Sequence, residues 1–96
     1  MKAFKKYRIL LADDHSVVRQ GIALLLREMV REPELLHAAT YAATLECIRT
    51  SEHIDYLFLD INFPDGNSTR MVQEIREIMP DIRILIFSAL EEDTYA

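Results

Sequence analysis

Three aspartates that follow two short apolar runs are the residues of this chain best suited to chemistry. Asp13 and Asp14 come directly after the run at 7–12, and Asp60 comes directly after the run at 56–59. If these carboxylates lie within a few ångströms of one another, either some of them are protonated at neutral pH or a cation lies among them. Carboxylate and carbonyl oxygens, together with water, suit Mg²⁺, which can also hold phosphate oxygens. Asp60 stands alone at its strand end before a turn, so it is the best placed to attack a phosphoryl group.

Each of these residues taken alone also has a plain structural explanation. Asp is favoured at helix N-caps and in turns, and a lone serine after a strand is common in turns. The three aspartates are all expected at one edge of two neighbouring strands, however, and this convergence favours a metal and phosphoryl site over separate structural roles. Ser88 follows the apolar run at 83–87, so its hydroxyl would face the same crevice and could donate a hydrogen bond to a phosphoryl oxygen.

Apolar periodicity predicts the elements that position these side chains. Short, nearly continuous apolar runs are typical of strands buried on both faces. Four such runs are present: 7–12, 35–39, 56–59 and 83–87. Apolar residues spaced three and four apart are typical of helices, and three such segments lie between the strands: 16 to about 31, 40 to about 51 and 68 to about 79. Acidic residues at 91–93 would begin one more helix.

The helix ends and faces can also be predicted. Ser16 and Thr40 are the expected N-caps of the first two helices. The second helix is expected to turn Leu45 and Ile48 inward, and Arg19 on the first helix is expected to face solvent. The buried face of the first helix is expected to consist of the apolar residues at helical spacing, which are Val18, Ile22, Leu25, Leu26 and Met29.

The order of these elements predicts the fold. Strands joined by helical crossovers pair in parallel with right-handed connections, which indicates an α/β fold with helices on both faces of the sheet. The flavodoxin-like, doubly wound strand order, 2-1-3-4 for the strands present here, makes the first and third strands neighbours. The chain winds outward from them in opposite directions, which opens a crevice at their carboxyl ends. Asp13, Asp14 and Asp60 are expected in that crevice.

Composition narrows the class of protein further. The chain has 96 residues, half of them apolar, and a net charge of −5, which indicates one small folded domain over 1–96. The net acidity argues against a surface for nucleic acids, because phosphate contacts need clustered Lys and Arg. No apolar run reaches the ~20 residues of a membrane span. The single Cys47 cannot form an internal disulfide and no signal peptide is evident, so we expect a cytoplasmic protein without membrane contact.

Three motifs in the sequence resemble the receiver domain of bacterial two-component response regulators, which has a CheY-like fold. The motifs are LLADDHSVVRQG at 10–21, LFLDINFPDG at 57–66 and ILIFSA at 84–89. The resemblance spans the whole chain, and the spacing of the motifs makes it specific. The Asp-Asp-His opening followed by Val-Arg-x-Gly is similar to the subfamily in which a LuxR-type helix-turn-helix domain follows the receiver.

The resemblance implies a role for each candidate residue. Asp60 would accept a phosphoryl group from a phosphohistidine of a sensor histidine kinase. Asp14 and Asp60 would ligate Mg²⁺ directly, together with the main-chain carbonyl of Asn62. Asp13 would act on the ion mainly through water, and Ser88 would hydrogen-bond the phosphoryl group.

The resemblance also implies what kind of protein this is. A receiver catalyses its own phosphorylation and dephosphorylation and has no separate substrate, so it is not a conventional enzyme. The parent protein would regulate transcription, and DNA would be contacted only by a C-terminal output domain that this chain lacks.

The chain departs from the family pattern near its C-terminal end. No lysine lies beyond Lys6, so the family lysine that pairs with the phosphoryl group is missing, together with the fifth strand and the last helices. We therefore expect a receiver truncated after the fourth strand and the start of a fourth helix. The edge of the strand at 83–87 would then be exposed, which predicts a homodimer or a strand-exchanged oligomer.

Two other functions stay open at this point. Without the family lysine, the chain could be an inactive receiver fragment that serves as an interaction module. A Mg²⁺-dependent phosphohydrolase also uses an aspartate nucleophile on an α/β sheet, but its Asp-x-Asp-x-Thr/Val signature is not met by residues 13–17.

Overall fold

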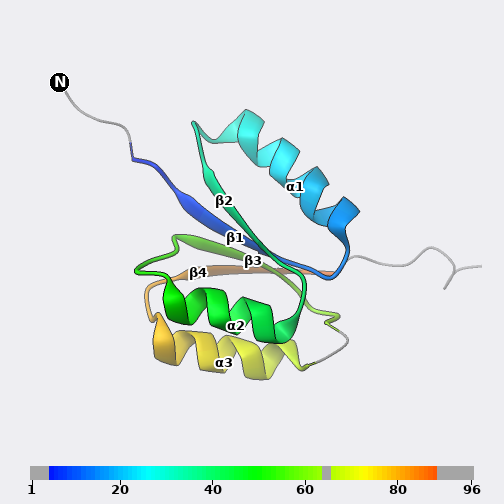
Figure 1. The fold of residues 1–96 in the computed structure, drawn as a ribbon, viewed down its shortest axis with the longest axis vertical. Coiled ribbons are helices and arrows are strands. Elements are labelled where there is room, and N and C mark those ends of the chain that lie inside the picture. Colours follow the sequence, from blue (N-terminus) through cyan, green and yellow to red (C-terminus); the bar gives the residue numbers. More distant parts are fainter. Residues whose placement is uncertain (1–4, 64–65, 89–96) are drawn as a thin grey trace, which may run out of the picture.

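The fold is a parallel sheet covered by helices on both faces (Figure 1). A computed structural model describes residues 5–63 and 66–88. In chain order, its elements are β1 (Arg8–Ala12), α1 (Ser16–Met29), β2 (Glu34–Ala38), α2 (Tyr41–Thr50), β3 (Tyr56–Asp60), α3 (Ser68–Ile78) and β4 (Arg83–Phe87). The helix expected to begin at 91–93 lies outside the described residues.

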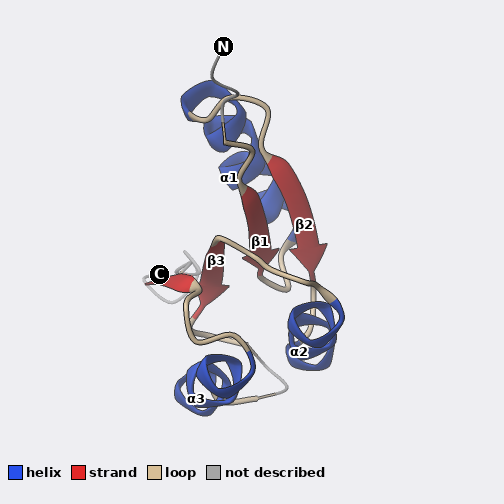
Figure 2. Ribbon diagram, turned by 90° about the vertical axis from the view of Figure 1, so that its left-hand side faces the viewer, coloured by secondary structure: helices blue, strands red, loops and turns tan. Residues whose placement is uncertain are grey.

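The sheet has the predicted strand order, β2-β1-β3-β4, and every neighbouring pair is parallel. This order confirms the doubly wound, flavodoxin-like topology. Helix α1 covers one face of the sheet, and α2 and α3 lie together on the other face (Figures 1 and 2). The chain reverses its winding direction between β1 and β3, so the carboxyl ends of these two strands form the predicted crevice.

Two apolar cores lie on the two faces of the sheet, because successive strand residues point to opposite sides. The larger core lies beneath α2 and α3 and includes Leu10, Leu57, Leu59, Ile48, Met71 and Ile75. The smaller core lies beneath α1 and consists of the buried residues Ile9, Leu11, Ala23 and Leu26. Burial of the strands on both faces explains why their sequences are nearly continuous apolar runs.

The prediction of which α1 residues face the sheet is wrong in part. Leu25 and Met29 were expected inside, but they are 59 % and 78 % exposed. The helix instead packs through Ala23 and Leu26, with Ile22 partly buried beside them. Periodicity alone weights the large apolar residues most heavily, so the small residue Ala23 was not assigned to the buried face.

The helix ends confirm one predicted cap and correct another. Thr40 caps α2, because its side chain accepts a hydrogen bond from the amide of Ala43 at 3.0 Å. Ser16 is not the cap of α1 but its first residue; His15 is the N-cap, and its side chain makes no capping hydrogen bond. Helix α1 also ends at Met29, earlier than expected.

Asp55 fastens the amino ends of the strands together. Its Oδ2 atom accepts a hydrogen bond from the amide of Arg8 at 2.8 Å, and its Oδ1 atom lies 3.2 Å from the Lys5 ammonium. Its own amide donates to the carbonyl of Arg8, and its carbonyl accepts from the amide of Arg83. Burial alone would raise the pKa of Asp55, but the Arg8 amide and Lys5 outweigh it and lower that pKa.

We predict that Asp55→Ala lowers the free energy of unfolding by about 1–3 kcal/mol, because it leaves the amide of Arg8 without its partner. Asp55→Asn keeps an acceptor for that amide and should cost less. The folded-state pKa of Asp55 is depressed, so its charge stabilises the fold above the unfolded pKa of 3.8 and this stability is lost as the pH falls through the folded pKa. Urea unfolding between about pH 6 and about pH 3 should therefore show the advantage of wild type over Asp55→Asn shrinking with acid. An advantage that grows with acid would contradict this account.

Candidate functional site

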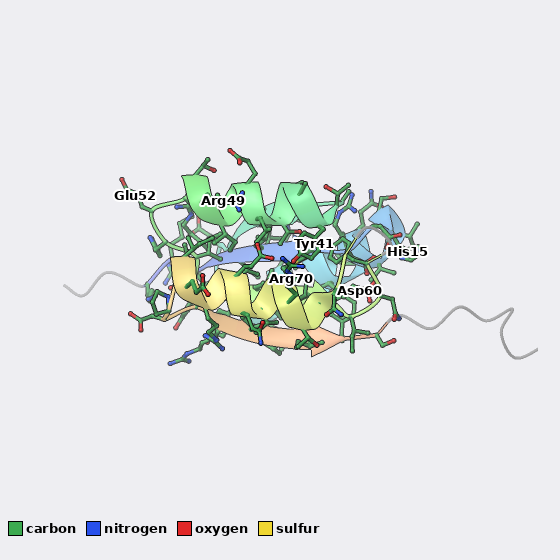
Figure 3. The ribbon with its side chains drawn as sticks, turned by 90° about the horizontal axis from the view of Figure 1, so that it is seen from below. His15, Tyr41, Arg49, Glu52, Asp60 and Arg70 are labelled. Carbon is green, nitrogen blue, oxygen red and sulfur yellow. The ribbon has the colours of Figure 1, made fainter. Side chains whose placement is uncertain are left out.

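The predicted site residues meet at the carboxyl ends of β1 and β3. Asp13 and Asp14 follow β1 directly, and Asp60 is the last residue of β3, which pairs with β1. Ligand atoms of Asp13, Asp14, His15 and Asp60 all lie within 4.8 Å of one another. Figure 3 shows His15 and Asp60 at one end of the molecule and Arg49 and Glu52 at the other. The register of the sheet thus gathers these carboxylates into one acidic pocket.

Two of the carboxylates are buried without enough partners. Asp13 is 1 % exposed and Asp60 is 0 % exposed, and the Oδ2 atom of each has no hydrogen-bond partner in the described part of the chain. Burial raises the pKa of Asp60, the amide of Asn62 opposes this rise, and the charges of Asp13 and Asp14 raise the pKa further. A buried carboxylate oxygen without a partner is unfavourable, so the pocket favours a proton or a cation.

His15, which follows Asp13 and Asp14 directly in the sequence, also belongs to the cluster. Its Nδ1 atom lies 2.9 Å from Oδ1 of Asp13 and 3.1 Å from Oδ1 of Asp14, and its backbone amide donates to Oδ1 of Asp13 at 2.8 Å. The hydrogen bond to Asp13 and the charge of Asp14 raise the pKa of His15. The available signal was the position of His15 next to Asp14 in the sequence.

The residues after β3 connect the acidic pocket to β4. The amide of Asn62 donates to Oδ1 of Asp60 at 3.0 Å, and the Asn62 side-chain amide donates to Oγ of Ser88 at 3.0 Å. The structure therefore brings Ser88, one residue beyond β4, into the neighbourhood of Asp60. The proposed metal-binding role of the Asn62 carbonyl stays a prediction.

Ser68 and Gly66, near the start of α3, make two contacts that the sequence analysis missed. The buried hydroxyl of Ser68 lies 3.0 Å from the carbonyls of both Asp60 and Ile61, to which it donates. Gly66 packs against the ring of Tyr41, and a Cβ atom at Gly66 would lie only 1.9 Å from Cδ2 of Tyr41. Glycine is required here by this close approach, which joins Gly66 to the start of α2.

Asn67 and Arg19 also have roles that the sequence analysis did not assign. The side chain of Asn67 caps α3 by accepting from the amides of Thr69 and Arg70. Arg19, which was expected to face solvent, is half-buried, and its guanidinium donates to the carbonyl of Asp13 and to Nδ1 of His37. Long polar side chains can bend back to such acceptors, and helical periodicity does not show this.

The fold and the pocket together define a class of protein: a doubly wound α/β domain with buried acids at the switch point of its sheet. The chain belongs to the response regulator receiver domain family, whose sequence model matches residues 9–96. No helix in the described part of the chain is both long enough and apolar enough to cross a membrane.

Known relatives agree with this assignment. The chain is 32 % identical over 88 residues to the DNA-binding transcriptional activator DevR/DosR of Mycobacterium tuberculosis, covering 90 % of this chain and 39 % of the relative. It is 34 % identical over 91 residues to the oxygen regulatory protein NreC of Staphylococcus epidermidis, covering 92 % of this chain and 40 % of the relative. The chain thus spans about two-fifths of the length of these relatives.

A solved structure supports the fold assignment. The response regulator TrrA of Thermotoga maritima, in a complex with Mg²⁺ and BeF, matches 88 % of this chain and 71 % of its own with a TM-score of 0.77 and 26 % identity. The match confirms the CheY-like arrangement that the strand order already indicates.

We predict that Asp60→Asn stabilises the metal-free protein by about 1–2 kcal/mol, because the new amide removes one buried charge and can donate to the unpartnered oxygen of Asp13. Chemical unfolding in EDTA measures this change. Asp81→Asn is the matched control, since Asp81 lies exposed in the turn before β4 and should change stability by less than about 0.5 kcal/mol. Destabilisation by Asp60→Asn would contradict this account, because it would mean that burial beside Asp13 and Asp14 does not disfavour the ionised form of Asp60.

Proposed function

We propose that this chain is the phosphoryl-accepting part of a two-component switch and that Asp60 is the acceptor. The observation that carries the proposal is the state of the Asp60 carboxylate, which is buried beside Asp13 and Asp14. Its Oδ1 atom accepts a hydrogen bond from the amide of Asn62, and its Oδ2 atom has no hydrogen-bond partner among the described residues. The amide of Asn62 fixes the rotation of the carboxylate, and Oδ2 keeps its lone pairs for attack on phosphorus.

The donor in this proposal is a phosphohistidine on a sensor histidine kinase. A new P–O bond forms to Oδ2 of Asp60, the P–N bond breaks, and the electron pair of that bond returns to the imidazole nitrogen of the kinase. The product is an acyl phosphate whose phosphoryl group carries about −1.5 to −2 charges, in place of the single negative charge of the Asp60 carboxylate. Solvent meets the cluster at Asp14, whose side chain is 30 % exposed, so the donor is expected to approach from that side.

The residues of the pocket fit Mg²⁺. Asp13 and Asp60 each offer a buried, unpartnered carboxylate oxygen, and Asp14 adds a third carboxylate, which is the hard oxygen set that this ion takes. We propose that these carboxylates and the main-chain carbonyl of Asn62 hold the ion, with Asp13 acting mainly through water. The ion would screen the repulsion between the Asp60 carboxylate and the incoming phosphoryl group.

Ser88 is proposed to bind the phosphoryl group through its hydroxyl. The Oγ atom already accepts a hydrogen bond from the side-chain amide of Asn62, so the hydroxyl hydrogen can be donated elsewhere. A negative phosphoryl oxygen beside Asp60 is a stronger acceptor than water. Ser88 would therefore report the phosphorylation of Asp60 to the end of β4.

We propose that the protein containing this receiver regulates transcription in the cytoplasm, because the relatives DevR/DosR and NreC are named as regulators. DNA would be contacted by a part of that protein outside residues 1–96. Receiver domains are in general not conventional enzymes, which agrees with a phosphoryl acceptor that belongs to the chain itself.

The proposal is tested by incubating the chain with Mg²⁺ and acetyl phosphate and measuring its intact mass. We expect one added phosphoryl group on wild type and on the control variant Asp81→Asn. We expect none on Asp60→Asn, whose amide oxygen is a poor nucleophile.

The same measurement separates the alternatives. Turnover of many phosphoesters without a stable adduct would favour a Mg²⁺-dependent phosphohydrolase. If the experiment shows no adduct and no turnover, an inactive interaction module is favoured. An adduct that persists in Asp60→Asn would place the acceptor elsewhere.

The exposed edge of the sheet supports a further proposal, that two copies of the chain associate through β4. Leu85 and Ile86 are 46 % and 52 % exposed, and β4 has one strand neighbour among the described residues. An apolar edge strand readily pairs with another chain.

We predict that light scattering after size exclusion detects a dimer at micromolar concentration and that Ile86→Lys shifts it to monomer. Lysine disfavours edge pairing because pairing would bring its charge into an apolar contact. Met29→Lys on α1 is the control, since Met29 is an exposed apolar residue on a different element. A clean wild-type monomer would contradict association through β4.

A further inference from the structure

The backbone amide of Asn62 holds the carboxylate of Asp60 in one rotation. The amide donates to Oδ1 of Asp60 at 3.0 Å, and Oδ2 is the oxygen without a hydrogen-bond partner among the described residues. The terminal bond of an aspartate side chain turns easily, so the carboxylate is only as well oriented as the group that holds it. The position of the Asn62 amide therefore decides which way Oδ2 faces.

The peptide unit that carries this amide is held from its other side by Ser68. The carbonyl of Ile61 and the amide of Asn62 belong to one planar trans peptide unit, so they point in opposite directions and turn together. The hydroxyl of Ser68 donates to the Ile61 carbonyl at 3.0 Å. A contact that holds this carbonyl also holds the amide and, through the amide, the Asp60 carboxylate.

The preceding peptide unit, between Asp60 and Ile61, has an anchor of its own in the sheet. Its amide, that of Ile61, donates to the carbonyl of Phe87 on β4 at 2.8 Å. Its carbonyl, that of Asp60, accepts from the Ser68 hydroxyl at 3.0 Å. This unit would keep its orientation through β4 if the hydroxyl were removed.

The unit between Ile61 and Asn62 has no such support from the sheet, since it lies beyond the end of β3. The side chains of Ile61 and Asn62 are both exposed, so core packing does not fix it. The side-chain amide of Asn62 reaches Ser88, but both groups are exposed, and water competes for hydrogen bonds of this kind. The Ser68 hydroxyl is thus the main restraint on the carbonyl side of this unit.

Ser68 can act as an anchor because it is itself firmly placed. It is 5 % exposed and is the first residue of α3. Directly before it, the side chain of Asn67 caps the helix by accepting from the amides of Thr69 and Arg70. Burial of the hydroxyl also limits competition from water for the two carbonyls that it contacts.

We propose that Ser68 is a positioning residue for the phosphorylation of Asp60. Its hydroxyl orients the Ile61–Asn62 peptide unit, whose amide sets the rotation of the Asp60 carboxylate and so presents Oδ2 to the phosphoryl donor. Ser68 acts only through the backbone and not on the reacting atoms. The inference rests on the proposed function, in which Oδ2 of Asp60 attacks phosphorus.

The first measurement is the hydrogen exchange of the Asn62 amide, followed by NMR in EDTA without any phosphoryl donor. We expect Ser68→Ala to speed this exchange by about tenfold, because the amide loses its fixed direction toward Oδ1. Ser68→Thr keeps a hydroxyl and should stay close to wild type. Ser68→Cys fills the space with a weak donor and should exchange at an intermediate rate, and it replaces Ser68→Ala if the alanine variant does not fold.

The second measurement is the rate of phosphorylation by acetyl phosphate with Mg²⁺, read from the intact mass over time. We expect Ser68→Ala to lower the maximal rate by about tenfold and to change the half-saturating concentration of acetyl phosphate by less than about twofold, because orientation and not binding is lost. Ser68→Thr should restore most of the rate.

Thr44→Val is the matched control for both measurements. Thr44 is also buried, and its hydroxyl donates to a main-chain carbonyl, that of Thr40, at 2.7 Å. Its loss should lower stability as the loss of the Ser68 hydroxyl does, without changing the Asn62 exchange or the phosphorylation rate.

The outcomes separate the inference from the proposed function. Equal effects of Ser68→Ala and Thr44→Val on both readouts would overturn the inference, because they would reflect lost stability alone. Slower phosphorylation of Ser68→Ala with an unchanged Asn62 amide would overturn it as well. Failure of wild type to take up a phosphoryl group would reject the proposed function, and the exchange of the Asn62 amide would then decide by itself whether Ser68 orients Asp60.

Discussion

The structure depends on one constraint: parallel neighbours in a sheet end at the same edge. β1 and β3 pair in register, with Ala12 opposite Leu59. The next residue of each chain segment, Asp13 after Ala12 and Asp60 after Leu59, therefore lies beside the other. Separating the two carboxylates would require breaking this ladder and exposing the apolar core beneath it. The hydrophobic burial of the strands thus holds like charges together, which is unfavourable unless a proton or a cation compensates them.

Polar contacts to the main chain then determine how the carboxylates are presented. The amide of Asn62 holds one oxygen of Asp60, and the hydroxyl of Ser68 ties the carbonyls at the end of β3 to the first turn of α3. Gly66 lets the same segment lie against the ring of Tyr41. Among the described residues, the second oxygen of Asp60 has no hydrogen-bond partner, and the proposed phosphoryl chemistry depends on this feature.

Several features were open to prediction because they follow from local rules. Continuous apolar runs mark strands buried on both faces, and helical crossovers force them to pair in parallel. The doubly wound strand order of flavodoxin-like folds then places Asp13, Asp14 and Asp60 at one edge of the sheet, as the structure shows. The cap at Thr40 follows from the preference of its hydroxyl for a free helix amide. The inward face of α1 could not be inferred, because Leu25 and Ala23 differ in burial through the path of the helix over the sheet and not through their own hydropathy.

The sequence by itself determined the element order, the parallel pairing of the strands and the identity of the acids, since apolar periodicity and the pairing rules for parallel strands act through composition and spacing alone. Only the tertiary structure decided which side chains complete the pocket. His15 turns toward the carboxylates, Arg19 turns to a carbonyl and to His37, and Ser88 meets Asn62 across the strand ends. The physical reason is that a side chain reaches its partner through a rotamer and a distance in space, and residues as far apart in sequence as Asn62 and Ser88 share neither until the sheet has formed.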